Sequence, residues 1–183
     1  MAGKRIIYTI GHSNRTIEAF VDLLEEHKIE LLVDVRSIPR SAHNPQFNSD
    51  VLPTSLTQNG IAYTHIVSLG GRRGTSNIHS RNTAWEHSSF RNYADYAETE
   101  PFRAGLEELM ALAKEKRTAY MCAEAVWWRC HRRIITDYLL ARGWNVVHIM
   151  GQDKTQEAEM NENAVVHEDG GITYPASQQS LSL

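Results

Sequence analysis

The stretch that decides the fold spans residues 118 to 133 and reads Thr-Ala-Tyr-Met-Cys-Ala-Glu-Ala-Val-Trp-Trp-Arg-Cys-His-Arg-Arg. It begins with a short apolar run that is typical of a buried strand and continues through a tight loop into an amphipathic segment. The apolar residues of that segment recur at the spacing of one helical face: Ile134, Ile135, Tyr138 and Leu139. The residues that this spacing turns away from the core are Arg132, Arg133, Asp137 and Arg142. The stretch therefore predicts a strand, a loop and a helix in direct succession.

This unit also concentrates reactive side chains. Both cysteines, Cys122 and Cys130, fall within it, together with Glu124, His131 and three arginines. At the start of a helix, unpaired backbone N–H groups and the positive end of the helix dipole favour a thiolate or a bound anion. We therefore expect a functional site here.

Length and composition favour one cytoplasmic domain. The chain has 183 residues, of which 42% are hydrophobic, and this is enough for a sizeable core. No apolar run behind Lys4 and Arg5 is long enough for a secretion signal, and no stretch approaches a membrane span, so we expect no membrane partner. Two cysteines do not form a disulfide framework, and in a reducing compartment we expect free thiols, metal ligands or buried apolar residues.

Charge is distributed unevenly along the chain. The net charge of -3 arises because residues 151–183 hold six acids and one lysine, whereas residues 1–150 hold 18 bases and 16 acids. We therefore expect an α/β domain over residues 1–150 and an acidic, loosely structured tail over residues 151–183. Arginine supplies 14 of the 19 bases, and its planar guanidinium forms paired hydrogen bonds with phosphate or carboxylate. Scattered arginines, however, are better explained by compositional bias than by binding.

Apolar runs alternate with helical spacing. The predicted strands are Arg5–Ile10, Leu31–Val35, Ile61–Ile66, the run around Tyr120 and Met121, and Trp144–Ile149. The predicted helices follow Thr16 as an N-cap, lie within residues 50–59, resume at Phe90, open at Pro101, and follow the cysteine loop as far as Gly143. This alternation predicts a single α/β domain with a mainly parallel five-stranded sheet flanked by helices.

Ionisable side chains gather where the predicted strands end. In chain order they are His12, Asp34, Arg36, His65, Cys122, Glu124 and His148. In open α/β sheets, ligands bind outside the carboxyl ends of the strands. The opposite edge of the sheet carries fewer such groups, so we expect a pocket at the carboxyl edge.

One chemical interpretation makes a thiolate the nucleophile, with Cys122 or Cys130 supplying the sulfur. The oxyanion would be held by Arg129 or Arg132, and protons would be moved by His131 or Glu124. Cysteine phosphatases and sulfurtransferases also place a cysteine loop between a strand and a helix. Their loops are rich in small residues, whereas two tryptophans occupy this one, so the analogy is weak.

Two other interpretations of the same residues stay open. The first is a metal site formed by Cys122, Cys130, His131 or Glu124, and His12. The Cys-x7-Cys-His spacing is not the close pairing of structural zinc sites, so such a site needs ligands from distant loops. The second is purely structural: the cysteines are small buried residues, and Glu124 forms an ion pair with an arginine.

Arginine and tryptophan together suggest an anion site with a stacking surface. Its candidate members are Arg36, Arg40, Arg72, Arg73, Arg132 and Arg133, with Trp127 and Trp128. Phosphate, a nucleotide or single-stranded nucleic acid would satisfy such a site. The near-neutral net charge argues against a large duplex footprint, and each tryptophan could equally be a core or interface residue.

With these motifs assembled, the sequence resembles the domain of unknown function 488 family, an uncharacterised group of small bacterial and archaeal proteins. The resemblance runs from about Tyr8 to Ile149 and rests on Thr9–Ser13, Val-Asp-Val-Arg with Pro39, Asn44–Phe47, Leu69–Arg72, and Cys-Ala-Glu followed by Cys-His-Arg. It implies a site made of His12, Asp34, Arg36, Arg72, Cys122, Glu124, Cys130, His131 and Arg132. The family has no established reaction, although some members carry DNA-repair descriptions.

The combined interpretation is an enzyme that acts on a small anionic, phosphate- or nucleotide-like substrate. Cys122 or Cys130 would be the thiolate, and His131 and Glu124 would transfer protons. The predicted substrate-binding residues are His12, Asp34, Arg36, Arg72 and Arg132. The alternatives are a non-catalytic nucleotide or nucleic-acid binding protein and a Cys/His metal protein. The sequence assigns no metal ligand set, cofactor or oligomeric state.

Overall fold

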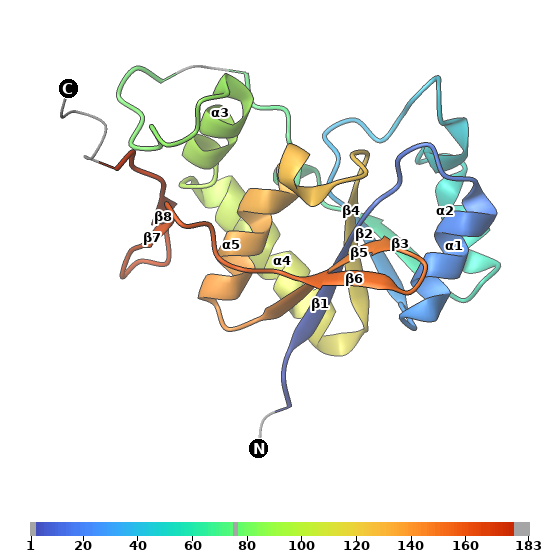
Figure 1. Ribbon diagram of the computed structural model, residues 1–183. Helices are drawn as coiled ribbons and strands as arrows, with labels where there is room; N and C mark the ends of the chain where they lie inside the picture. Colours follow the sequence, from blue (N-terminus) through green and yellow to red (C-terminus); the bar gives the residue numbers. More distant parts are fainter. Residues whose placement is uncertain (1–2, 75–76, 178–183) are drawn as a thin grey trace.

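The computed structural model describes residues 3–74 and 77–177 as one α/β domain built on a six-stranded sheet in the order β3-β2-β4-β1-β5-β6 (Figure 1). The strands are β1 (Ile6–Gly11), β2 (Leu31–Asp34), β3 (Ala62–His65), β4 (Thr118–Cys122), β5 (Asn145–Gly151) and β6 (Lys154–Glu157). The α-helices are α1 (Ile17–Glu26), α2 (Leu52–Thr57), α3 (Ser88–Tyr96), α4 (Glu100–Glu115) and α5 (Arg132–Ala141). Shorter elements are the 3₁₀ turns Pro45–Phe47, Val67–Leu69 and Trp127–Arg129, and the hairpin of β7 (Val165–Val166) and β8 (Ile172–Thr173).

Strands β1 to β5 are parallel, which confirms the predicted single α/β domain with a mainly parallel sheet. The sixth strand is antiparallel to β5 and was missed. Its residues are polar and exposed, and a turn with Asp153 at φ 54 brings its backbone beside β5. Pairing through the backbone alone leaves no hydrophobic pattern to detect.

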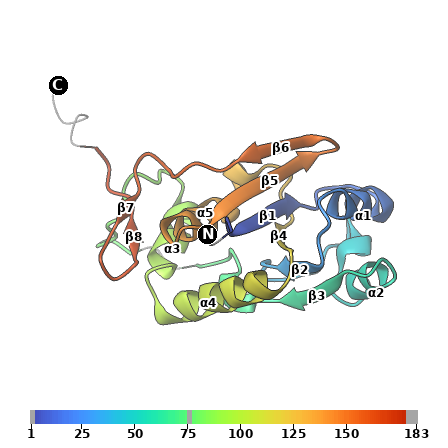
Figure 2. The same cartoon turned by 90° about the horizontal axis from the view of Figure 1, so that it is seen from below.

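Helices cover both faces of the sheet, as Figure 2 shows with α4 and α5 on one side and α1 and α2 on the other. The core is correspondingly divided into two clusters of buried side chains. Neighbouring residues of β4 point to opposite faces, so Tyr120 packs in the α4/α5 cluster and Met121 in the α1/α2 cluster. A strand buried on both faces reads as a continuous apolar run.

Local signals place the helix ends. The Thr16 hydroxyl accepts a hydrogen bond from the backbone N–H of Ala19 at 3.1 Å, so Thr16 caps α1 as expected. Pro101 lies in the first turn of α4, and Gly143 adopts φ 82 just beyond α5. Among the helices of the described residues, none has both the length and the apolar character needed to cross a membrane.

The predicted outward face of α5 is wrong at two positions. Arg132 and Asp137 are only 1% and 2% exposed. Asp137 accepts hydrogen bonds from the Tyr174 hydroxyl at 2.8 Å and from the backbone N–H of Asn161 at 2.9 Å. Both partners come from the C-terminal segment, which covers this face of the helix. Helical periodicity along α5 cannot register a segment that arrives from elsewhere in the chain.

That C-terminal segment differs from the expected loosely structured tail as far as Ser177. Tyr174 is fully buried, and its backbone N–H donates to Asn82 Oδ1 at 2.9 Å. Ile172 is also fully buried and belongs to the α4/α5 core cluster. The acidic composition of residues 151–183 gave no indication that Ile172 and Tyr174 are buried. Residues 178–183 of the predicted tail lie outside the described residues.

Asp137 makes stability depend on pH. Burial raises the pKa of Asp137 to about 6, although hydrogen bonds from Asn161 and Tyr174 oppose this rise. The pKa of Asp137 in the folded state exceeds the unfolded value of about 3.9. The contribution of protonated Asp137 to the stability of the folded protein is therefore complete below about pH 4 and is lost as pH rises through about 6. We expect Asp137→Asn to gain about 2–3 kcal/mol relative to the parent protein between about pH 4 and pH 7.

Urea denaturation at several pH values measures this difference. The matched control is Asp22→Asn, the same change at an exposed position of α1. A difference between Asp137→Asn and the parent that stays constant over this pH range would contradict the assignment.

Candidate active site

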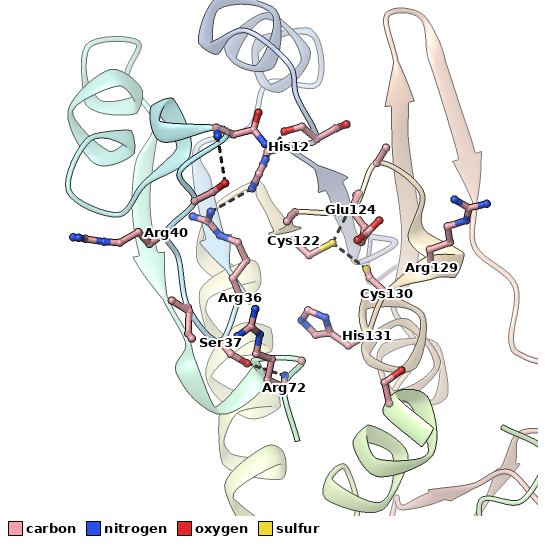
Figure 3. A pocket seen from close by; sticks show the side chains of 18 of the residues that line it. His12, Arg36, Ser37, Arg40, Arg72, Cys122, Glu124, Arg129, Cys130 and His131 are labelled. Atoms are coloured by element: carbon pink, nitrogen blue, oxygen red, sulfur yellow. Dashed lines mark hydrogen bonds between the residues drawn. The ribbon is translucent and has the colours of Figure 1, made fainter. Parts of the chain in front are cut away.

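A cavity of about 740 Å³ lies at the carboxyl ends of β1, β2 and β4 (Figure 3). Parallel pairing aligns Gly11 of β1 with Cys122 of β4, and Asp34 of β2 with Met121. The loops that follow these strands therefore meet at one edge of the sheet. The volume lies in the range that small-molecule sites occupy.

Seven of the nine predicted site residues line this cavity: His12, Arg36, Arg72, Cys122, Glu124, Cys130 and His131. The other two, Asp34 and Arg132, are not among the lining residues, but each contacts one that is. In Figure 3, Arg36, Arg40 and Arg72 form one wall, and Cys130, His131 and Arg129 form the wall opposite. The structure thus brings together residues from distant segments.

The two sulfurs and Arg132 form the centre of the site. Cys122 Sγ lies 3.0 Å from Cys130 Sγ, and both thiols are free. Arg132 Nε donates to Cys122 Sγ at 3.0 Å and to Cys130 Sγ at 3.3 Å. Its Nη1 donates to Thr9 Oγ1 at 2.9 Å, and its Nη2 donates to the Glu124 carbonyl at 2.8 Å. Every one of these partners apart from the sulfurs is electrically neutral.

A buried guanidinium needs a counter-ion, because burying an unpaired charge costs several kcal/mol. Among the described residues no carboxylate forms an ion pair with Arg132. Burial alone would raise the pKa of Cys130, but the hydrogen bond from Cys122 and the charge of Arg132 lower it to about 5. Burial and the neighbouring sulfur raise the pKa of Cys122. The two pKa shifts therefore run in opposite directions, downward for Cys130 and upward for Cys122.

Gly11 lets the cysteine loop pass close to β1. A Cβ at this position would lie 1.7 Å from the Glu124 carbonyl oxygen, so only glycine fits. The loop is fixed to β1 by two backbone hydrogen bonds of 3.0 Å, from His12 N to the Cys122 carbonyl and from Ser13 N to the Ala123 carbonyl. This contact directs the Glu124 carbonyl toward Arg132.

Arg36 is held in place by the strand that precedes it. Its Nε and Nη2 donate to the two carboxylate oxygens of Asp34 at 2.9 and 2.6 Å. Nη2 also donates to the Phe47 carbonyl at 2.7 Å, and Nη1 donates to His12 Nε2 at 3.3 Å. A guanidinium has five N–H donors, and the described residues accept from all of them except one at Nη1.

His12 positions Arg36 and is not a free base. Its Nδ1 donates to the Ser13 carbonyl at 2.7 Å, and its ring stacks on that of Phe47 with 4.4 Å between the ring centroids. Burial and the charge of Arg36 lower the pKa of His12 to about 4, although the Ser13 hydrogen bond opposes this. The imidazole is therefore neutral at physiological pH, and both nitrogens are already engaged.

His131 carries a lone pair on Nδ1 to which no described residue donates. Its Nε2 lies 2.6 Å from the Val35 carbonyl, and because a carbonyl only accepts, this nitrogen carries the hydrogen. Burial lowers the pKa of His131, so Nδ1 is an unprotonated acceptor. A Cβ at Gly71 would lie 2.5 Å from Nδ1, so glycine is required where the loop passes the ring.

The exposed rim of the cavity is predominantly cationic. Arg72 and Arg129 are exposed and form no ion pair within the described residues. Arg40, in contrast, forms an ion pair with Asp50, with 3.7 Å between Nη2 and Oδ2. Glu124 is exposed and supplies the one carboxylate among the described residues that line the cavity. Glu124 also has no ion pair within the described part of the chain, in contrast to the structural interpretation made from its sequence.

Sequence reasoning missed Thr9 and misplaced His148. Thr9 is fully buried and accepts from Arg132, and its hydroxyl contacts His148 Nδ1 at 2.8 Å. His148 stacks on Trp127 at 4.6 Å and is not among the residues that line the cavity. A threonine within the apolar run of β1 was a usable signal, because a buried hydroxyl needs a partner. No group of three or more potential metal ligands occurs in residues 3–74 and 77–177.

Comparison with known proteins identifies the family. Residues 16–139, more than half of the chain, match the family described as Domain of unknown function DUF488. No curated protein and no solved structure matches the chain. The matched residues include the cysteine loop and every predicted site residue except His12. The resemblance predicted from the sequence motifs is thus confirmed, and the chain belongs to the DUF488 family.

Proposed function

We propose that this protein is an enzyme that uses a Cys130 thiolate to act on a small anionic substrate. One observation carries the proposal: the buried guanidinium of Arg132 contacts both sulfurs and has no carboxylate partner among the described residues. Cys130 is 8% exposed and lines the cavity, so its sulfur can meet a bound molecule. A stabilised thiolate is the reactive form of cysteine.

The surrounding residues fit the needs of such chemistry. Arg72 and Arg129 on the rim, with the remaining donor of Arg36, supply positive charge for an anion. His131 Nδ1 is the proton acceptor nearest in sequence to the nucleophile, and Glu124 is a second proton carrier on the rim. Arg132 stabilises the thiolate, although Arg132 is buried and is not among the residues that line the cavity. A reducing cytoplasm would keep both thiols available.

Alkylation by iodoacetamide at varied pH tests the thiolate. We expect the labelling rate of Cys130 to rise through a midpoint near pH 5, the pKa to which Cys122 and Arg132 lower this thiol. Arg132→Met removes the counter-ion and should move the midpoint upward by more than about one pH unit. The matched control is Arg133→Met, since Arg133 packs over the Trp85 ring and not on the sulfurs.

Circular dichroism shows whether Arg132→Met folds, and Cys122→Ala provides a second variant that also removes a stabilising hydrogen bond. A parent midpoint near the ordinary thiol pKa of about 8.5 would refute the thiolate.

Charge selectivity tests the preference for anions. Iodoacetate and iodoacetamide differ mainly by one negative charge, so the ratio of their rates reports the local potential. We expect Arg72→Ala and Arg129→Ala each to lower the iodoacetate rate about threefold to tenfold and to leave the iodoacetamide rate nearly unchanged. Arg5→Ala, which alters an exposed arginine at the opposite edge of the sheet, is the control. Equal effects on both reagents would argue against an anion site.

A second candidate function is binding of a nucleotide or single-stranded nucleic acid without catalysis. A second cavity of about 690 Å³ adjoins the first and shares Ser89, Phe90, Glu124 and Arg129 with it. Trp128 lines this second cavity and is 42% exposed, so it offers a stacking surface beside cationic groups.

Fluorescence anisotropy with a labelled single-stranded oligonucleotide measures this binding. We expect the affinity to fall with added salt, and Trp128→Ala to weaken it about fivefold to 100-fold through lost base stacking. Trp144→Phe, a conservative change at a buried tryptophan, is the control. Salt-independent affinity, or no binding, would eliminate this candidate.

A further inference from the structure

We propose that Cys122 and Cys130 act together as a dithiol that reduces small anionic disulfides, with Cys130 as the attacking sulfur and Cys122 as the resolving sulfur. The inference rests on the proposed thiolate of Cys130 and goes further, because it assigns a substrate class and gives the second cysteine a chemical task. The structure offers three supports: the distance between the sulfurs, their shared counter-ion and the charge of the cavity.

The separation of the sulfurs suits direct attack of one on the other. Cys122 is the last residue of β4, and Cys130 precedes α5 by two positions, yet their Sγ atoms lie 3.0 Å apart. Reacting atoms in a near-attack arrangement are about 3–3.5 Å apart. A disulfide bond of about 2 Å then requires a shift of roughly 1 Å in total.

The shared counter-ion allows negative charge to move between the sulfurs. Arg132 Nε reaches Cys122 Sγ at 3.0 Å and Cys130 Sγ at 3.3 Å. The backbone N–H of Arg132 also donates to Cys130 Sγ at 3.4 Å. Whichever sulfur carries the charge therefore remains beside a guanidinium. A hydrolase with one nucleophile has no need for this arrangement.

The chemical steps balance as a thiol–disulfide exchange. The Cys130 thiolate attacks a substrate R–S–S–R′, which breaks the substrate S–S bond, forms Cys130–S–S–R and releases R′–S⁻. Cys122 then attacks Cys130 Sγ, which forms the Cys122–Cys130 disulfide and releases R–S⁻. The Cys122 proton passes to the departing thiolate. The substrate gains two electrons, the protein loses two, and an external dithiol reductant returns the protein to its starting state.

The cavity accounts for the preferred charge of the substrate. Arg72 and Arg129 stand on its rim, and Arg36, which lines it, keeps one N–H donor that no described residue accepts. Carboxylates on either arm of a disulfide would meet these groups while the S–S bond reaches Cys130. A cationic disulfide of the same length would be repelled.

Two probes of matched length test the inference: 3,3′-dithiodipropionate, which carries two carboxylates, and cystamine, which carries two ammonium groups. With the reduced protein and dithiodipropionate we expect roughly two equivalents of 3-mercaptopropionate and an intramolecular disulfide by intact mass spectrometry. Cys122→Ser should release one equivalent and accumulate the mixed disulfide on Cys130. Cystamine should react at least about tenfold more slowly, after correction for the reaction of each probe with free cysteine.

The possible failures are distinguishable. A parent protein that stops at the mixed disulfide, or Cys122→Ser that resolves it at the parent rate, would overturn the relay and leave the Cys130 thiolate intact. Faster reaction with cystamine would overturn the anionic substrate class. Reaction of Cys130→Ser at the parent rate would refute the proposed function itself. Melting curves of both serine variants confirm that each is folded before the rates are compared.

Discussion

The interaction on which the rest of the structure depends is the contact of the Arg132 guanidinium with Cys122 and Cys130. The guanidinium is buried and also donates to Thr9 of β1 and to the carbonyl of Glu124 in the cysteine loop. Its partners come from a strand, a loop and a neighbouring strand, so they assemble only when these elements are packed. Because a buried charge without partners is strongly destabilising, this contact helps to fix the local fold, and it is also the contact on which the proposed thiolate of Cys130 rests.

The arginines of the site divide into two groups by burial. Arg36 and Arg132 are buried, and most of their donors are already engaged by protein groups, so they keep the walls in place. Arg72 and Arg129 are exposed and form no ion pair within the described residues. The buried pair therefore preserves the geometry of the cavity, while the exposed pair supplies the positive charge that the proposed anionic substrate requires.

The same burial keeps the nearby histidines neutral. Burial lowers the pKa of His12 to about 4 and that of His148 to about 3, with the charges of Arg36 and Arg132 acting in the same direction. His131 follows the same trend, since burial lowers its pKa too. Each ring therefore acts through the hydrogen bonds of its neutral form. The positive charge of the cavity comes from arginine and stays constant across the physiological pH range.

The sequence by itself determined the α/β class, the strand–loop–helix unit, the carboxyl edge of the sheet as the place of the cavity, and the family, because these follow from hydrophobic periodicity and from ordered motifs. It also named the residues that meet in the cavity, since parallel strands deliver their ends to one edge. Only the tertiary structure decided that Arg132 and Asp137 are buried, that His12 positions Arg36, and that the cysteine sulfurs touch. The physical reason is that periodicity along one helix reports which residues avoid water, whereas the partner of a polar group arrives from a distant segment that no local pattern records.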